Sequence, residues 1–141
     1  YVVMLVANKT GSETMESYKG LGARAPFLSV AMAIFLVSLT GLPPTAGFVG
    51  KLYIFAALIN AKMITLAIIG VLNSVISLYY YARVFRNIFL RDSTTETTTV
   101  DSPVFARVLL VMLLLPTIVL GIYFGPLAQF AQYSVAMFGI K

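Results

Sequence analysis

The sequence contains no cysteine and no histidine, and only five of its 141 residues are aspartate or glutamate. Their absence excludes disulfide bonds, thiolate nucleophiles, iron–sulfur ligation and the usual ligands of zinc and haem. The five carboxylates all fall in predicted loops, which argues against a carboxylate metal site or an acid–base carboxylate pair. If this chain carries out chemistry, we expect it to move protons or ions rather than to break covalent bonds.

Charge of either sign is scarce. Only 11% of the residues are charged, against about 25% in a soluble domain, whereas 60% are hydrophobic and the mean hydropathy is +0.93. The apolar residues form long runs, which indicates that the lipid bilayer is the solvent. The net charge of +5 is typical of a membrane protein with basic cytoplasmic loops. We expect no nucleic-acid partner, because the basic residues form no stripe.

The apolar runs predict an all-α, polytopic transmembrane helix bundle. The predicted segments are the end of a helix at 1–7, a broken helix at 27–60, helices at 63–90 and 103–124, and an apolar segment at 127–138 that is too short to span and is expected to lie along the membrane interface. Polar loops are expected at 8–25 and 91–102. Because the chain lacks an initial methionine and its first apolar run is short, we expect it to be the C-terminal part of a longer protein.

The segment 27–60 is interrupted in its middle. Its first apolar run, 27–42, has a length of about 24 Å and ends at Pro43 and Pro44, and its second run, 52–61, has a length of about 15 Å. Neither run covers the ~30 Å hydrocarbon core. The segment therefore crosses the membrane once as a broken helix or twice as a hairpin of short helices.

The distribution of basic residues favours the single crossing. With one crossing, seven basic residues lie on one side, and only Lys62 and Lys141 lie on the other. With two crossings the bias almost disappears. The seven-charge side is then the cytoplasmic side and the C-terminus is periplasmic; its residues are Lys9, Lys19, Arg24, Arg83, Arg86, Arg91 and Arg107.

Lys51 is the main candidate functional residue. It follows the sequence GLPPTAGFVG and is expected to open the second half of the broken helix. A charged residue within a membrane span is costly and usually faces the protein interior or a water-filled cavity. Desolvation disfavours the charged ammonium, so a lysine there can load and release a proton. The structural alternative is a side chain that extends to the lipid headgroups.

Other polar residues lie close to this position in the sequence. Ser38 and Thr40 precede the break, where they can bond to freed backbone groups or line water. Asn73, Ser74 and Ser77 lie within the long helix 63–90, and Asn73 and Ser77 share a face at i, i+4. That pair either holds a water chain or, as we favour, joins neighbouring helices by hydrogen bonds.

Three stretches carry a resemblance to a known family. The sequences YKGLGARAP, SLTGLPPTAGFVGKLYIF and VLNSVISLYYYARV resemble the C-terminal part of the antiporter-like subunits of respiratory complex I, a family that includes Mrp-type cation/proton antiporters and membrane-bound hydrogenases. The resemblance implies a fourteen-helix fold with two inverted repeats, each with one broken helix. It also implies that Lys51 exchanges protons with the outlet side, at the end of a line of buried lysines.

The same resemblance implies the surroundings of the chain. We expect a proton-translocating subunit of an NADH–quinone oxidoreductase in the bacterial inner membrane, with other complex I membrane subunits as partners. No cofactor is expected in this chain; FMN, iron–sulfur clusters and quinone are expected elsewhere in the complex. The alternatives are a subunit of an Mrp-type antiporter or membrane-bound hydrogenase, and a purely structural scaffold.

Overall fold

The computed structural model of the chain describes residues 1–91, 103–126, 128–130 and 133. Within these ranges the chain is helical and contains no strand, which confirms the predicted all-α fold class. The helices are α1 (Val2–Thr10), the 3₁₀ helix η1 (Met15–Tyr18), α2 (Leu21–Arg24), α3 (Pro26–Thr40), α4 (Ala46–Asn60), α5 (Ile64–Leu90) and α6 (Val104–Ile122). Most of the predicted interfacial segment 127–138 lies outside the described residues, which include only 128–130 and 133 of it.

The N-terminal part differs from the predicted loop at 8–25. Helix α1 continues to Thr10 and ends at Gly11, whose φ of 67° is the left-handed conformation that glycine adopts without strain. The predicted loop then contains η1 and α2, because Tyr18 and Leu21 are apolar enough to be buried in the core. Burial, with a smaller contribution from Glu13, raises the pKa of the Tyr18 phenol.

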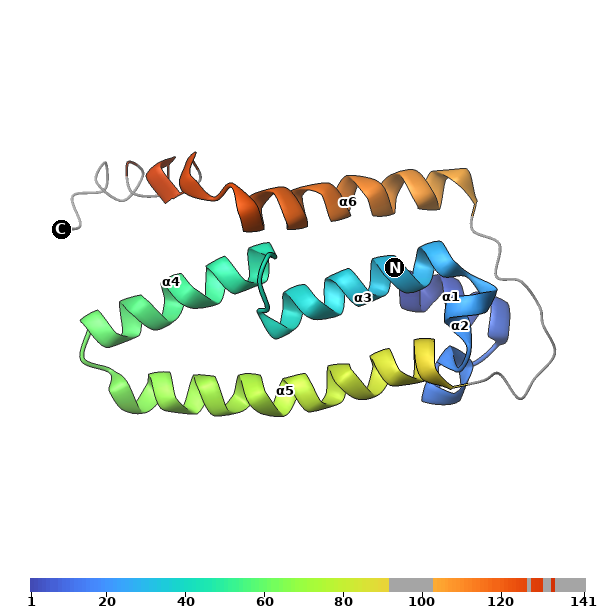
Figure 1. Ribbon diagram of the computed structural model, residues 1–141, viewed down its shortest axis with the longest axis horizontal. Coiled ribbons are helices and arrows are strands. Elements are labelled where there is room, and N and C mark those ends of the chain that lie inside the picture. The colour runs from blue at the N-terminus through green and yellow to red at the C-terminus, as the bar shows by residue number, and fades with distance from the viewer. Residues whose placement is uncertain (92–102, 127, 131–132, 134–141) are drawn as a thin grey trace.

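Helices α3 and α4 lie end to end along the long axis of the molecule, between α5 and α6 (Figure 1). Helix α5 runs back beside both, from the end of α4 to the start of α3. The core lies at that last end, where Leu28 of α3, Ile88 of α5 and Leu110 of α6 are all almost fully buried. Residues 41–45, which connect α3 to α4 and are called the break below, lie outside this core, near the middle of the bundle.

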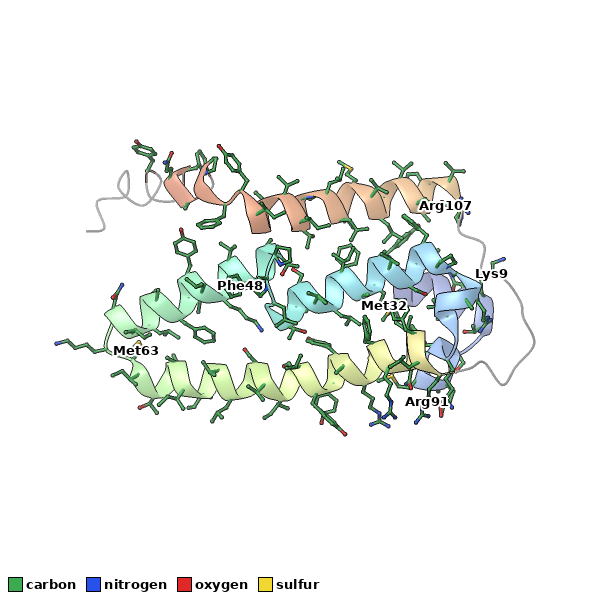
Figure 2. The ribbon with its side chains drawn as sticks, in the orientation of Figure 1. Lys9, Met32, Phe48, Met63, Arg91 and Arg107 are labelled. Carbon is green, nitrogen blue, oxygen red and sulfur yellow. The ribbon has the colours of Figure 1, made fainter. Side chains whose placement is uncertain are left out.

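Basic residues gather at the same end as the core. Lys9, Arg91 and Arg107 lie there, whereas Met63, in the turn between α4 and α5, lies at the opposite end (Figure 2). In that turn Lys62 adopts a left-handed φ of 58°, and the amide of Met63 donates to the Leu58 carbonyl at 2.9 Å. Lys9, Arg91 and Arg107 are three of the seven basic residues that the single-crossing prediction places on one side of the membrane, and that crossing stays a prediction.

Within the described ranges, two helices, α5 and α6, are long and apolar enough to cross a membrane, whereas α3 and α4 are shorter apolar helices. The 27 residues of α5 correspond to about 40 Å, which exceeds the ~30 Å hydrocarbon core. Most large apolar side chains of α5 and α6 are exposed in this part of the chain. They are therefore available to lipid or to further helices.

Helix α6 packs directly on the break. A Cβ atom at Gly121 would overlap the carbonyl oxygen of Pro44 and would lie 2.5 Å from the Cα atom of Thr45. Because both contacts are with backbone, they cannot be relieved by a side-chain rotation. The hydrogen side chain of Gly121 therefore permits the close approach that holds α6 against both α3 and α4.

Replacement of this glycine tests the packing. We expect Gly121→Ala to destabilise the full-length protein in its native assembly by about 1–3 kcal/mol, because the added methyl group overpacks the break. Gly50→Ala in α4 is the matched control, since no atom lies within 4 Å of its added Cβ, and alanine favours a helix. The midpoint temperature for loss of the assembly on native gels measures both variants. An equal midpoint for the two would contradict the packing.

Candidate functional site

The break comprises residues 41–45. Gly41 follows α3 with a φ of 83°, and its amide donates to the carbonyls of Val37 and Ser38 at 3.1 and 3.0 Å. This left-handed glycine ends the helix as a C-terminal cap. The Pro43–Pro44 peptide bond is cis. Helix α4 then begins at Ala46, after the buried Thr45, whose hydroxyl donates to the Leu42 carbonyl at 2.7 Å.

The two prolines remove both possible helical partners of the Thr40 carbonyl. In a continuing helix the Thr40 carbonyl would accept from the amide of residue 44, or from residue 43 in a 3₁₀ turn. Both positions are proline, which has no N–H. The Thr40 oxygen therefore needs a donor from elsewhere, because an unsatisfied carbonyl in an apolar environment is costly.

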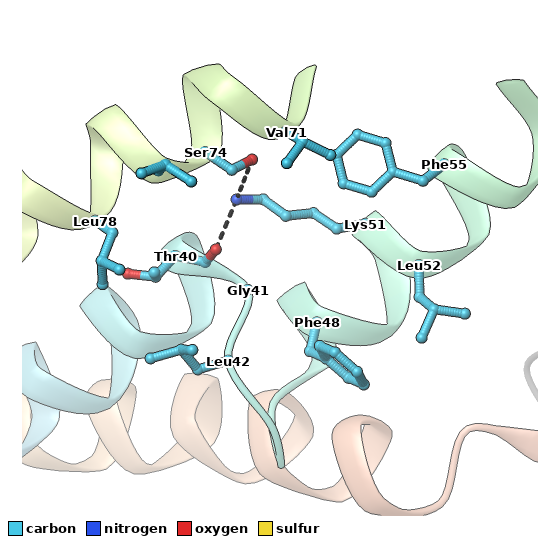
Figure 3. Close-up of a pocket in the computed structure, with 11 residues that line it drawn as sticks. Thr40, Gly41, Leu42, Phe48, Lys51, Leu52, Phe55, Val71, Ser74 and Leu78 are labelled. Carbon is cyan, nitrogen blue, oxygen red and sulfur yellow. Dashed lines mark hydrogen bonds between the residues drawn. The ribbon is translucent and has the colours of Figure 1, made fainter. Parts of the chain in front are cut away.

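Lys51 supplies that donor. Its Nζ donates to the Thr40 carbonyl oxygen at 2.8 Å and to Ser74 Oγ on α5 at 3.2 Å (Figure 3). Ser74 Oγ in turn donates to the Gly70 carbonyl at 3.0 Å. The ammonium thus joins the end of α3, the second turn of α4 and the middle of α5. Two of its three N–H donors have a partner in the described part of the chain, and the third is available to water.

The position of Lys51 within its helix differs from the predicted position. The sequence was expected to start the second half-helix at Lys51, but α4 begins at Ala46 and Lys51 is its sixth residue. The charge lies inside the helix rather than at its end. About nine residues, or ~14 Å, separate it from the last residue of α4.

The ammonium lies beside a cavity of about 280 Å³ with mostly apolar walls. Its polar contributors are Thr40, Lys51 and Ser74, and the walls also contain two phenylalanines and several aliphatic side chains (Figure 3). The wall residues are Gly41, Leu42, Phe48, Leu52, Phe55, Val71, Val75 and Leu78. A volume of this size accommodates several water molecules, and the polar groups converge at one point where such waters can bond.

The other residues predicted near the break contribute to this site in different ways. Ser38 Oγ accepts from the Gly47 amide at 3.2 Å, and so joins the last turn of α3 to the first turn of α4. The Thr40 hydroxyl donates to the Leu36 carbonyl at 2.7 Å, so it is the backbone of Thr40 that meets Lys51. Pro43 and Pro44 are exposed in the described structure. Their part in the site is that neither has an N–H group to donate to the Thr40 carbonyl.

In the described residues, the hydrogen bonds of Lys51 involve neither Asn73 nor Ser77. Ser77 Oγ donates to the Asn73 carbonyl at 2.9 Å within α5, and the Asn73 side chain is exposed in this part of the chain. Ser74 is the residue of this group that reaches the lysine. A signal for it was present in the sequence, since Ala67, Gly70 and Ser74 are small residues spaced three and four apart, a pattern typical of a closely packed helix face.

In the described ranges no three histidine, cysteine, aspartate or glutamate side chains come together. The donor set of one ammonium, one hydroxyl and backbone carbonyls instead suits the binding and transfer of protons through water.

Comparison with known proteins identifies the family. A transmembrane family described as NADH:quinone oxidoreductase/Mrp antiporter matches residues 1–77. The chain is 44% identical to NADH-quinone oxidoreductase subunit N of Chlorobium chlorochromatii over 100% of this chain and 28% of the relative. It is 51% identical to subunit N 2 of Sorangium cellulosum over 96% of this chain and 28% of the relative. The chain spans about 28% of the length of these curated relatives.

The geometry makes a prediction about Gly41. A Cβ atom there would lie 2.6 Å from Lys51 Cδ, and its φ of 83° already disfavours a side chain. We expect Gly41→Ala to displace the lysine from the Thr40 carbonyl and thus to raise the rate at which Lys51 is reductively methylated in the full-length protein. Mass spectrometry measures the rate, with the exposed Lys62 as internal reference. An unchanged ratio of the two rates would show that Lys51 does not depend on this glycine.

Proposed function

The chain belongs to the NADH:quinone oxidoreductase/Mrp antiporter transmembrane family, and from this premise we propose that it is part of a proton-translocating membrane subunit of an NADH–quinone oxidoreductase. The observation that carries the proposal is the Lys51 ammonium, bonded to the freed Thr40 carbonyl at a helix break. The similarity to subunit N supports the same assignment over nearly the whole chain.

We place the segment 27–60 across the membrane as a single broken crossing. Its supports are the end-to-end arrangement of α3 and α4 and the gathering of Lys9, Arg91 and Arg107 at one end (Figures 1 and 2). By the positive-inside rule that end is cytoplasmic, which puts the C-terminus on the periplasmic side of a bacterial inner membrane. Lys51 then lies within the hydrocarbon depth, where a charge costs about 3 kcal/mol or more. The bonds to Thr40 and Ser74 offset part of this cost.

Lys51 is the proton-exchanging group in this proposal. In one direction an N–H bond of the ammonium breaks, the proton passes to a water molecule in the adjacent cavity, and a neutral amine remains; in the other direction the amine takes a proton from water. Ser74 suits both states, because its hydroxyl accepts from the ammonium and can donate to the amine lone pair. The Thr40 carbonyl accepts an N–H in either state.

Electron transfer takes place elsewhere in the complex in this account. FMN, iron–sulfur clusters and quinone are assigned to other subunits, and quinone reduction there drives the change of charge and hydration that reaches Lys51. The other membrane subunits of the complex are the partners, together with the lipid bilayer. Ser38, Pro43 and Pro44 maintain the break, and we assign Asn73 and Ser77 to helix packing.

A second candidate function is a subunit of an Mrp-type cation/proton antiporter or membrane-bound hydrogenase, because the matching family includes Mrp antiporters. The two functions differ in the process that drives proton movement across the membrane. An oxidoreductase subunit moves protons when NADH is oxidised, whereas an antiporter subunit moves them when a sodium gradient is imposed without electron transfer.

Proton pumping by a lysine variant tests the proposal. In inverted membrane vesicles we expect Lys51→Met to reduce NADH-driven proton uptake at least tenfold, because methionine has nearly the same length and carries no proton. Lys62→Met, which removes the lysine of the α4–α5 turn, is the matched control and should pump normally. Native gels establish that both variants assemble.

Two outcomes would contradict the proposal. Normal pumping by an assembled Lys51→Met variant would remove Lys51 from the proton path. Proton movement that follows an imposed sodium gradient, but not NADH oxidation, would favour the antiporter.

A further inference from the structure

A basic hollow lies on the outer side of α5, away from Lys51. Tyr79, Ala82, Arg83 and Arg86 line a cavity of about 440 Å³. Spacings of three, four and seven residues place these side chains on one strip of the helix. Arg83 and Arg86 are exposed, whereas Val84, on the opposite side, packs against the core. The hollow therefore opens away from α3.

The hollow lies at a particular depth along α5. From Ile64, the first residue of the helix, to Arg83 there are 19 steps, or about 29 Å. This distance equals the ~30 Å thickness of the hydrocarbon core. If Ile64 marks one boundary of the core, as the adjacent Lys62 suggests, the guanidinium groups lie at the opposite headgroup layer and the Tyr79 ring lies just inside it. Tyrosine is enriched at this depth.

The two arginines lack a counter-ion in the described part of the chain. The ion pair in the described ranges joins Lys19 to Glu16, and within those ranges no ion pair involves Arg83 or Arg86. Two like charges three residues apart on one helix face repel each other. An anion between them removes the repulsion, and a guanidinium binds phosphate oxygens through two parallel N–H bonds.

We propose that Tyr79, Arg83 and Arg86 form a binding site for the phosphate of an anionic glycerophospholipid. The small side chain of Ala82 leaves the space between the arginines and the tyrosine. The arginines bind the phosphate, the Tyr79 hydroxyl donates a further hydrogen bond, and the acyl chains run along the exposed apolar face of α5 toward Ile64. Basic pockets on the cytoplasmic side of membrane helices suit such headgroups. The site depends on the membrane placement of α5 and not on any role of Lys51.

Photo-crosslinking tests this site in the intact complex. The full-length protein in its native complex is reconstituted into phosphatidylcholine membranes that contain a trace of photoactivatable phosphatidylglycerol, and crosslinks are mapped by mass spectrometry to the peptide with residues 79–86. We expect Arg83→Gln together with Arg86→Gln to reduce crosslinking about tenfold. Arg91→Gln, a charge removed from the end of the same helix outside the hollow, should leave it unchanged.

Competition on the unmodified complex keeps the test decisive if the double variant fails to assemble. Excess unlabelled phosphatidylglycerol should suppress the crosslink, whereas excess phosphatidylcholine or inorganic phosphate should not. Equal suppression by phosphatidylcholine would overturn the proposal, because it would reveal contact with acyl chains alone. Suppression by inorganic phosphate would overturn it in favour of a soluble anion. If the double arginine variant loses the crosslink but pumps protons normally, the lipid site is independent of the function proposed for Lys51.

Discussion

The carbonyl oxygen of Thr40 is the group on which the rest of the site depends. Pro43 and Pro44 remove both amides that could have satisfied it within α3. In an apolar environment that oxygen requires a donor, and an ammonium requires acceptors. The bond from Lys51 to Thr40 meets both needs at once. The break is therefore both the end of a helix and the means by which a charge is accommodated among apolar helices.

The surrounding helices are adapted to this bond. On one side, Ser74 of α5 supplies the second acceptor of the lysine and donates to the Gly70 carbonyl. The space above Gly70 is taken by the Phe55 ring, which a Cβ atom there would meet at 2.8 Å. On the other side, α6 approaches the backbone of the break at Gly121. Gly41 completes the arrangement, because a methyl group there would occupy the space of the Lys51 side chain. At Gly41 and at Gly121, an added methyl group would meet the Lys51 side chain and the backbone of the break, respectively.

Part of this arrangement could be predicted from local rules. The apolar runs predicted the all-helical membrane fold, and the proline pair lies between α3 and α4. The scarcity of charge drew attention to Lys51, whose functional role stays a prediction. The family was also identified from three short motifs, and the match over residues 1–77 confirms it. These features depend on composition and on neighbours in the sequence, which a single sequence contains.

The rest depends on tertiary packing. Lys51 was expected at the start of a helix because a charge was taken as the boundary of an apolar run, but the uncharged residues 46–50 are helical as well. Asn73 was preferred to Ser74 because it pairs with Ser77, yet the face of α5 that meets α4 is set by where small residues permit close contact. Tyr18 and Leu21 lie in a polar stretch, and only their burial reveals short helices there.

The most direct measurement is a double-mutant cycle between Lys51 and Ser74 on the stability of the assembled complex. The account predicts that Lys51→Met and Ser74→Ala are non-additive by about 1 kcal/mol, because each variant removes the same hydrogen bond. The equivalent cycle with Ser77→Ala should be additive, since the hydrogen bond of Ser77 in the described ranges is to the Asn73 carbonyl within α5. Additive effects of Lys51 and Ser74 in an assembled complex would contradict the account, because the lysine would then be held by something other than this site.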